Sequence, residues 1–262
     1  MPEPAHASAT TSMSLATRSV GGLVLALLLA GCASQAQRIA AQPVGDPIEP
    51  LNRKVYAFND SLDRALLRPA AVGWKAGTPP QFRTGVSNFI DNALMPVTII
   101  NDFLQGKPAQ GGKDTARFVM NTIVGLGGLF DPATEAGLPY NQEDFGQTLN
   151  TWGVPQGPFL MVPFLGPRTV SSAAGNVADL PASPYLQLSS NDVRFGLFGI
   201  NLINSRAGLL ELDEEVRNAY DPYVFVRDAY LQNRAYRIAD GNLMPAEPED
   251  FDDYGDEAEP AP

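Results

Sequence analysis

Residues 46–66 read DPIEPLNRKVYAFNDSLDRAL, and their pattern decides the fold class. The apolar residues of this stretch follow one another at steps of four, three, four and four, namely Leu51, Val55, Phe58, Leu62 and Leu66. Such steps place the side chains on one face of a helix. The preceding residues 46–49 supply a capping aspartate, a proline suited to the first turn and a returning glutamate. The stretch therefore predicts an amphipathic helix.

Helical patterns continue along most of the chain. They predict further helices over residues 81–92, 96–105, 113–124, 143–151, 167–177, 193–218 and 221–237. Met95-Pro96 is expected to divide the first two of these. Residues 159–165 (FLMVPFL) are compatible with a short strand, but Pro163 interrupts it. Long period-two alternation is nearly absent, so the fold class is predicted to be all-α.

The N-terminus carries an export signal. Val20 to Ala30 (VGGLVLALLLA) is an eleven-residue apolar run behind Arg18, too short to span a bilayer. It ends in Leu29-Ala30-Gly31-Cys32, which resembles the bacterial lipobox. Residues 1–31 are therefore predicted to be a lipoprotein signal peptide and Cys32 to be lipidated. The alternative is a plain signal peptide with an incidental cysteine.

Cleavage before Cys32 removes most catalytic chemistry from the chain. The single histidine is His6 and the single cysteine is Cys32, so the mature chain has no histidine and no free thiol. This excludes Ser-His-Asp and Cys-His sites and a Cys/His zinc site. Gly125-Leu126-Gly127-Gly128 is no dinucleotide fingerprint, because Phe130 stands where a third glycine is needed. We therefore expect no metal, no cofactor and no enzymatic activity.

The charge is distributed unevenly. The net charge is -11, and residues 241–262 hold eight acidic residues without a lysine or arginine. We expect residues 32–45 to be a lipidated tether, 46–240 a helical domain and 241–262 a disordered acidic tail. A chain this acidic is a poor nucleic-acid binder, because neutralising phosphates needs clustered Lys and Arg.

Two predicted helices are more apolar than a soluble monomer needs. Residues 96–104 read PVTIINDFL, and residues 118–130 read FVMNTIVGLGGLF. Neither approaches the roughly 18 residues that a membrane-spanning helix requires. They are either buried core helices, which periodicity alone favours, or helices lying in the interface of the membrane that anchors Cys32.

Two further features have open interpretations. Gly125, Gly127 and Gly128 end an apolar helix, either as a turn after its C-terminus or as a pliable element beside a lipid path. In the last predicted helix Tyr223, Arg227, Tyr230 and Arg234 share one face. That face suits a membrane interface or phosphate headgroups, but equally a helix packed through its tyrosines.

An ordered series of motifs resembles one known family. The motifs are residues 46–53 (DPIEPLNR) with Tyr56, Phe58 and Asn59, then 85–89 (GVSNF), 96–97 (PV), 104–108 (LQGKP), 117–118 (RF), 121–122 (NT), 125–128 (GLGG), 144–149 (DFGQTL), 152–155 (WGVP), 157–159 (GPF) and 221–232 (DPYVFVRDAYLQ). Together they resemble the MlaA/VacJ lipoprotein family of Gram-negative bacteria over about residues 43–237.

The resemblance implies a ring-like helical protein in the periplasmic leaflet of the outer membrane, associated with a trimeric porin. It implies a channel that removes mislocalised glycerophospholipids from the outer leaflet. The lipid then passes to a soluble periplasmic carrier of the MlaC type, which maintains lipid asymmetry. The residues we expect along the lipid path are Phe58, Asn59, Gly125, Gly127, Gly128, Tyr223, Arg227 and Tyr230.

A second hypothesis stays open from the residues alone. The chain can be a lipid-anchored periplasmic scaffold or a hydrolase that uses carboxylates only. The adjacent pairs Glu143/Asp144 and Glu214/Glu215 are its most visible carboxylates, although such pairs are commonly solvated helix charges.

Overall fold

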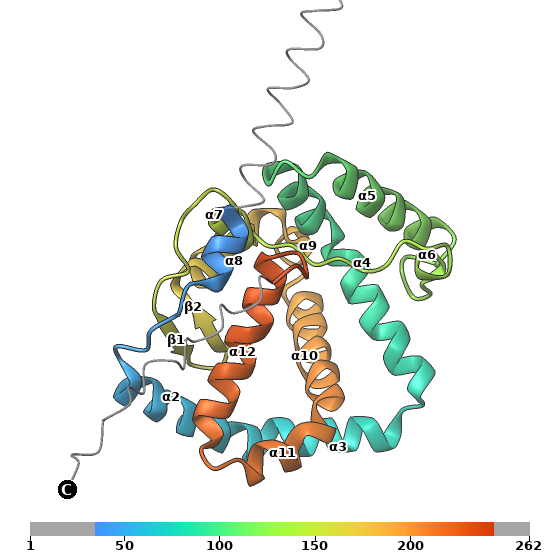
Figure 1. Ribbon diagram of the computed structural model, residues 1–262. Helices are drawn as coiled ribbons and strands as arrows, with labels where there is room; N and C mark the ends of the chain where they lie inside the picture. The colour runs from blue at the N-terminus through green and yellow to red at the C-terminus, as the bar shows by residue number, and fades with distance from the viewer. Residues whose placement is uncertain (1–34, 244–262) are drawn as a thin grey trace, which may run out of the picture.

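The computed structural model describes residues 35–243, apart from the side chains of residues 185 and 186. The described elements are helices joined by one small hairpin, as Figure 1 shows. They are α2 (Glu49–Leu62), a π-helical turn (Asp63–Leu67), α3 (Arg68–Gly77), α4 (Pro80–Leu104), α5 (Pro108–Ile123), α6 (Pro132–Glu135), α7 (Phe145–Thr151), β1 (Phe159–Val162), β2 (Gly166–Thr169), α8 (Val170–Asp179), a 3₁₀ turn (Leu180–Ala182), α9 (Pro184–Gln187), α10 (Asn191–Gly208), a second 3₁₀ turn (Leu210–Leu212), α11 (Asp213–Asn218) and α12 (Pro222–Ile238).

The helices are arranged as a ring with two helices inside it. In Figure 1, α2 and α3 form one edge, α4 rises from the end of α3, and α5 folds back over the far end of α4. The hairpin, α7 and α8 close the opposite side, while α12 and α10 run through the interior. The predicted helical, ring-like fold is confirmed.

The helix predicted over residues 51–66 is confirmed and extends further than expected. It passes without a break from α2 into α3 through the π-helical turn, in which the N–H of Arg68 donates to the carbonyl of Asp63. Pro69 follows directly and has no N–H of its own. A turn with wider hydrogen bonding lets the chain remain helical on either side of such a residue.

Two boundary predictions are wrong. Residues 81–92 and 96–105 belong to one 25-residue helix, α4, with Pro96 inside it. Met95 and Val97 are buried on either side of this proline. One turn earlier, the side chain of Asn92 donates to the hydroxyl of Thr122 in α5. Packing against α5 therefore keeps the chain helical where the local preference favours a break. The single helix predicted over residues 193–218 ends instead at Gly208, and a 3₁₀ turn separates it from α11.

The short strand expected in residues 159–165 is present, but it is half of a hairpin. β1 pairs antiparallel with β2, from Phe159 opposite Thr169 to Val162 opposite Gly166. Residues 167–169 were expected to be helical and instead complete β2. α8 begins after Thr169, whose side chain accepts from the backbone of Ser172 in a reciprocal capping box.

Residues 35–41 form a helix where we expected a tether. Ala36 and Ala40 pack against Ile238 and Ala239 at the end of α12. Ile39 is also buried. The tether predicted for residues 32–45 is therefore wrong for this segment, because its small side chains pack closely against another helix end. Cys32, the predicted signal peptide and residues 244–262 of the predicted acidic tail lie outside the described residues.

The buried sides of α4 and α5 are unusually polar. Asn101, Asp102, Asp114, Arg117 and Asn121 of α4 and α5 are buried. Several apolar side chains of the same helices are exposed instead, namely Ile100, Phe103, Leu104, Val119 and Ile123, whereas Met95 and Val97 are buried. Ile123 is 71% exposed. The interpretation of these segments as buried core helices is therefore wrong. Within the described residues, no helix has both the length and the apolarity to cross a membrane.

Candidate functional site

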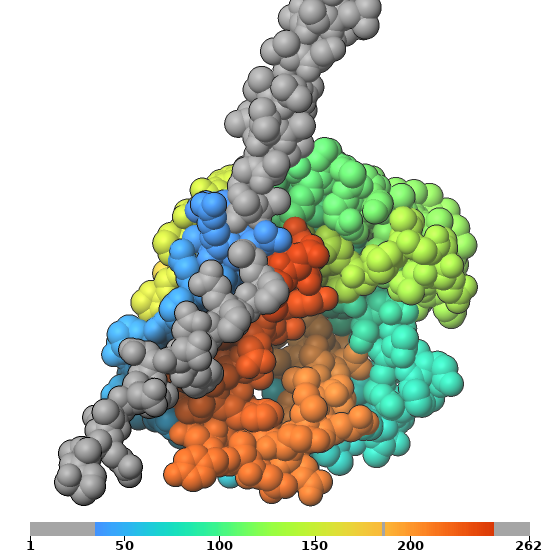
Figure 2. Space-filling model, in the orientation of Figure 1, coloured from blue at the N-terminus to red at the C-terminus, as the bar shows by residue number. Residues whose placement is uncertain are grey.

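A cavity of about 770 Å³ lies inside the ring. It is bounded by α2, the π-helical turn, the hairpin, the end of α10, α11 and α12. The surface is hollowed between α12 and α10 (Figure 2). Ligand cavities in proteins typically have volumes of about 300–1,000 Å³. This is the candidate functional site.

Part of the lining of this cavity is apolar, and we call these residues the apolar wall. Its side chains come from the hairpin, from the segment between α10 and α11, from α11 and from α12, and include Met161, Leu209, Leu212, Val216, Phe225 and Val226. Leu209, Leu212 and Phe225 are themselves exposed to solvent. Exposed apolar side chains around a hollow are a favourable environment for hydrocarbon.

The other wall carries three aspartates and four arginines, namely Asp60, Asp63, Asp213, Arg64, Arg68, Arg206 and Arg217. Arg206 is central, because its Nε and one terminal nitrogen donate to the two oxygens of Asp63 at 2.8 and 2.9 Å. It also donates to Asp213 at 2.7 Å, and Arg68 donates to the second oxygen of Asp213 at 2.7 Å. These ion pairs connect α3, α10 and α11.

The ion pairs fix the charged state of this wall. Burial alone would raise the pKa of Asp213, but hydrogen bonds from Arg68 and Arg206 bring it below the usual value. The hydrogen bond to Asp63 raises the pKa of Arg206. Asp63 lies in the π-helical turn, a conformation that is frequent at functional sites. These contacts favour the charged forms of Asp213 and Arg206.

Of the eight residues expected along a lipid path, the cavity is lined by Asn59. Its side chain donates to the carbonyl of Val162 at 3.0 Å and accepts from the N–H of Phe164 at 2.9 Å. Asn59 thereby attaches α2 to the hairpin. Phe58 does not line the cavity, and packs edge-on against Phe164 with ring centroids 5.4 Å apart.

The three expected residues of α12 do not line the cavity either. Tyr223 is buried against Phe159, and its hydroxyl donates to Asp46. Arg227 is paired with Asp228 at 2.8 Å. The Tyr230 hydroxyl is hydrogen-bonded to Ser172 at 2.8 Å. These contacts agree with the interpretation of a helix packed through its tyrosines.

The glycines lie elsewhere in the ring. Leu126, Gly127 and Gly128 follow α5 with positive φ angles of 52°, 74° and 95°. A Cβ at Gly128 would lie 2.5 Å from the Cβ of Asn92, and one at Gly125 would lie 2.4 Å from the carbonyl of Phe130. The segment has the geometry of a tight turn beside α4 and does not line the cavity.

Both the sequence and the structure of the chain are similar to those of known proteins. The family model for the MlaA lipoprotein matches residues 44–237. This chain belongs to the MlaA lipoprotein family. The family resemblance expected from the motifs is thereby confirmed.

Named relatives cover most of the chain. The intermembrane phospholipid transport system lipoproteins MlaA of Shigella flexneri and of Escherichia coli (strain K12) are each 38% identical over 224 residues, which is 84% of this chain and 88% of theirs. A solved structure from work on the structural basis for maintenance of bacterial outer membrane lipid asymmetry is also similar. It has a TM-score of 0.67 and 38% identity, and the match covers 74% of this chain and 99% of that one.

Sequence reasoning missed the arginines and aspartates of this family member's cavity. Asp63 and Arg206 are 143 residues apart, and Arg68 and Asp213 are 145 apart. In the sequence Asp63 shows only as one of several charged residues between the apolar positions of the first helix. No spacing rule connects it to Arg206.

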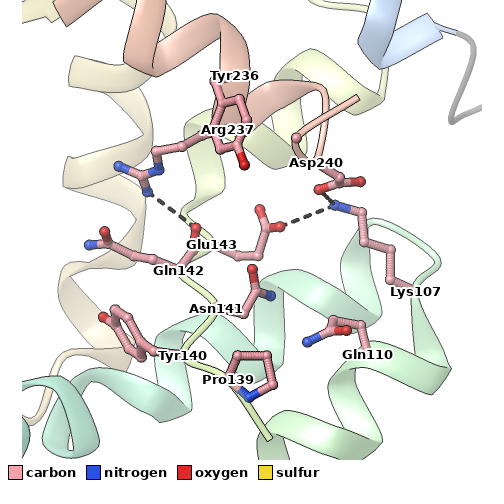
Figure 3. Close-up of a pocket in the computed structure, with 11 residues that line it drawn as sticks. Lys107, Gln110, Pro139, Tyr140, Asn141, Gln142, Glu143, Tyr236, Arg237 and Asp240 are labelled. Atoms are coloured by element: carbon pink, nitrogen blue, oxygen red, sulfur yellow. Dashed lines mark hydrogen bonds and ion pairs between the residues drawn. The ribbon is translucent and has the colours of Figure 1, made fainter. Parts of the chain in front are cut away.

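A second cavity, of about 620 Å³, lies near the end of α12 and is shown in Figure 3. Lys107 donates to Glu143 at 3.1 Å and to Asp240 at 2.5 Å. Arg237 donates to the carbonyl of Gln142 at 3.2 Å. With Tyr140 and Tyr236 these groups make the lining more polar than that of the first cavity, which is less favourable for acyl chains.

Two buried carboxyl groups lie close to this second cavity without lining it. Asn141 donates to Asp102 at 3.4 Å and to Asp114 at 3.0 Å. Burial, and then the neighbouring Asp114, raise the pKa of Asp102 to about 8. Asp102 therefore keeps its proton near neutral pH. Neither carboxyl forms part of the cavity wall, and Asn141 is the side chain that connects them.

Proposed function

We propose that this chain is a non-enzymatic lipoprotein channel that removes mislocalised glycerophospholipids from the outer leaflet of the outer membrane. It passes them toward a periplasmic lipid carrier and so maintains lipid asymmetry. The observation that carries the proposal is the cavity inside the ring, with one apolar and one charged wall. The names of the relatives as intermembrane phospholipid transport lipoproteins support it.

The two walls match the two parts of a phospholipid. Charged headgroups are costly to bury unless charged or polar partners receive them. The arginines and aspartates of the cavity supply such partners, while Met161, Leu212 and Phe225 supply apolar surface for the beginnings of the acyl chains. In this cavity the headgroup of a lipid can contact charged side chains while its acyl chains contact apolar ones.

The outer surface of the ring supports a position within one membrane leaflet. Ile123, Val124, Leu126 and Phe130 are all exposed, at the end of α5 and in the segment that follows it. α4 adds Ile100, Phe103 and Leu104. Short helices with one apolar face lie in a membrane interface with that face toward the acyl chains. Lipidation of Cys32 would hold the ring at the periplasmic leaflet of the outer membrane.

A channel of this kind needs a partner on each side of the transfer step. The relatives are named as parts of a transport system, which supports additional components. We propose a trimeric porin as the membrane partner and a carrier of the MlaC type as the soluble acceptor. A soluble carrier is needed because an isolated phospholipid cannot cross an aqueous space with its chains exposed.

Hydrolysis by carboxylates has little support in the described residues. A general acid or base must be available to the substrate. Asp60, Asp63 and Asp213 of the first cavity are each paired with an arginine, and Glu143 and Asp240 of the second are paired with Lys107. Glu214 and Glu215 line neither of these cavities. A scaffold without transport would leave the cavity without a function.

Copurification tests the proposed function. The full chain is extracted from membranes in mild detergent, and bound lipid and porin are assayed by mass spectrometry. The same protein is incubated with phosphatidylglycerol, and lysolipid is measured. We expect intact glycerophospholipid, a bound porin and no lysolipid. Absence of bound phospholipid, or release of fatty acid, would contradict the proposal. Intact-mass analysis of the same sample reports acylation of Cys32.

A further inference from the structure

The charged wall of the cavity has one more arginine than it has aspartates. Arg64 is paired with Asp60. Arg206 is paired with Asp63 and Asp213, and Arg68 is also paired with Asp213. These ion pairs use all three carboxylates that line the cavity. The lining therefore carries a formal charge of +1, and the fourth guanidinium belongs to Arg217.

Arg217 differs from the other three arginines in its contacts. Its Nε donates to the main-chain carbonyl of Asp213 at 3.1 Å, which orients the side chain along α11. Within the described residues its guanidinium makes no ion pair with a carboxylate. The neighbouring Glu214 and Glu215 do not line the cavity. The terminal nitrogens of Arg217 are thus available to an anion without the loss of an existing ion pair.

We propose that Arg217 contacts the phosphodiester of a glycerophospholipid in the cavity, and that this contact distinguishes phospholipids from uncharged diacyl lipids. The inference rests on the proposed function. A phosphodiester carries one negative charge and two free oxygens, which match the excess charge of the lining and the planar fork of a guanidinium.

The apolar wall favours a lipid phosphate over free phosphate. Val216 precedes Arg217 in α11 and lines the same cavity, together with Leu212 and Phe225. An anion bound to Arg217 therefore lies in a cavity that also offers apolar surface to a glycerol backbone and its chains. Inorganic phosphate gains only the charge-assisted hydrogen bonds, whereas a phospholipid gains these and apolar burial.

The other arginines are unsuitable for the test. Replacement of Arg206 would leave Asp63 without its partner, and replacement of Arg68 would remove one of the two arginines paired with Asp213. Either change would disturb the contacts among α3, α10 and α11. Arg217→Gln removes a charge that forms no ion pair with a carboxylate of residues 35–243. Arg217→Lys keeps the charge, and Arg38→Gln is a matched control, because Arg38 is exposed and lies outside the cavity.

The experiment uses delipidated full-length protein and mixed micelles with equal amounts of dioleoyl phosphatidylglycerol and dioleoylglycerol. Retained lipids are quantified by mass spectrometry. We expect the unsubstituted protein and Arg38→Gln to retain phosphatidylglycerol preferentially, and Arg217→Lys to keep most of this preference. Arg217→Gln should lower the ratio of phosphatidylglycerol to dioleoylglycerol about tenfold, the effect of one charge-assisted hydrogen bond.

The other outcomes separate a failure of the Arg217 proposal from a failure of the proposed function. An unchanged lipid ratio in Arg217→Gln, with both lipids still retained, would overturn the role of Arg217 and leave the proposed function intact. Retention of neither lipid by the unsubstituted protein would instead contradict the proposed function. In a third arm, excess inorganic phosphate is added to the unsubstituted protein. Loss of phosphatidylglycerol in this arm would assign the site to free phosphate and overturn recognition of the lipid.

Discussion

At the scale of single residues, Asp102 makes stability depend on pH. Its pKa is raised to about 8 in the folded chain, well above the ordinary aspartate value, because the carboxyl is buried beside Asp114. Between these two values the folded state binds more protons than the unfolded state, so this group lowers the free energy of unfolding as pH rises. The loss is up to about 1 kcal/mol per pH unit.

Asp102→Asn mimics the protonated carboxyl and should remove that loss. We expect the melting temperature of the variant to fall less than that of the unsubstituted protein between pH 5 and about pH 8. Thermal unfolding followed by circular dichroism measures both. Asp192→Asn is the control, since Asp192 is exposed at the start of α10. Parallel pH curves for the unsubstituted protein and Asp102→Asn would show that Asp102 is ionised when folded.

Arg234 is the second informative residue. It is buried in α12, and its two terminal nitrogens donate to the two oxygens of Asp144 at 2.5 and 2.9 Å. Arg234→Met should lower the free energy of unfolding by about 3–5 kcal/mol, because Asp144 loses its main partner inside the protein. The double variant Arg234→Met, Asp144→Leu should recover part of this loss in urea unfolding. If the double variant recovers no stability, the loss in Arg234→Met comes from altered packing and not from the unpaired charge of Asp144.

At the scale of elements, two glycines in the turn after α5 are present for different reasons. Gly127 only adopts a positive φ angle, whereas Gly128 also leaves room for Asn92. Gly127→Ala places a side chain in open space at positive φ and should cost about 1 kcal/mol. Gly128→Ala adds a collision with Asn92 and should cost roughly 2–3 kcal/mol in urea unfolding. Equal costs would contradict this account. Normal stability of Gly128→Ala with phospholipid accumulating in the outer leaflet would instead support a pliable element beside a lipid path.

Elements defined by local signals were predictable from the sequence. The helix around residues 51–66 has clear periodicity, and α12 is preceded by Asp221, whose side chain caps its first turn. The errors occur where tertiary contacts override local preference. Pro96 lies within α4 because Met95 and Val97 are buried in packing contacts, and residues 167–169 are extended because they pair with β1. A single sequence carries little information about such contacts.

At the scale of the whole molecule, the sequence predicts the helices but leaves open which of their faces is buried. Periodicity is the same for a helix that faces a protein core and one that faces lipid. In α5 it is Asp114, Arg117 and Asn121 that are buried, while Val119 and Ile123 are exposed. The cavity was equally hard to predict, because its arginines and aspartates come from three separate segments. Asn59 was found through its place in the opening motif.

The acidic C-terminal segment should be dispensable for the fold. Residues 244–262 contain all eight acidic residues counted after Gly241 and no basic residue to pair with them. Truncation after Leu243 keeps the backbone bond from the Gly241 N–H to Tyr236. We expect the helical circular dichroism signal per molecule to be unchanged and the melting temperature to change by less than about 2 °C. A large drop in melting temperature would show that this segment docks on the ring.

The central claim is that phospholipid moves through the cavity inside the ring. Ala229 is exposed and lines that cavity, so Ala229→Trp fills it without removing packing. Ala116→Trp on the exposed face of α5 is the matched control. The measurement is outer-leaflet phospholipid in cells that lack the gene and carry each variant at equal abundance. We predict accumulation with Ala229→Trp and normal asymmetry with Ala116→Trp. Normal asymmetry with Ala229→Trp would contradict the claim.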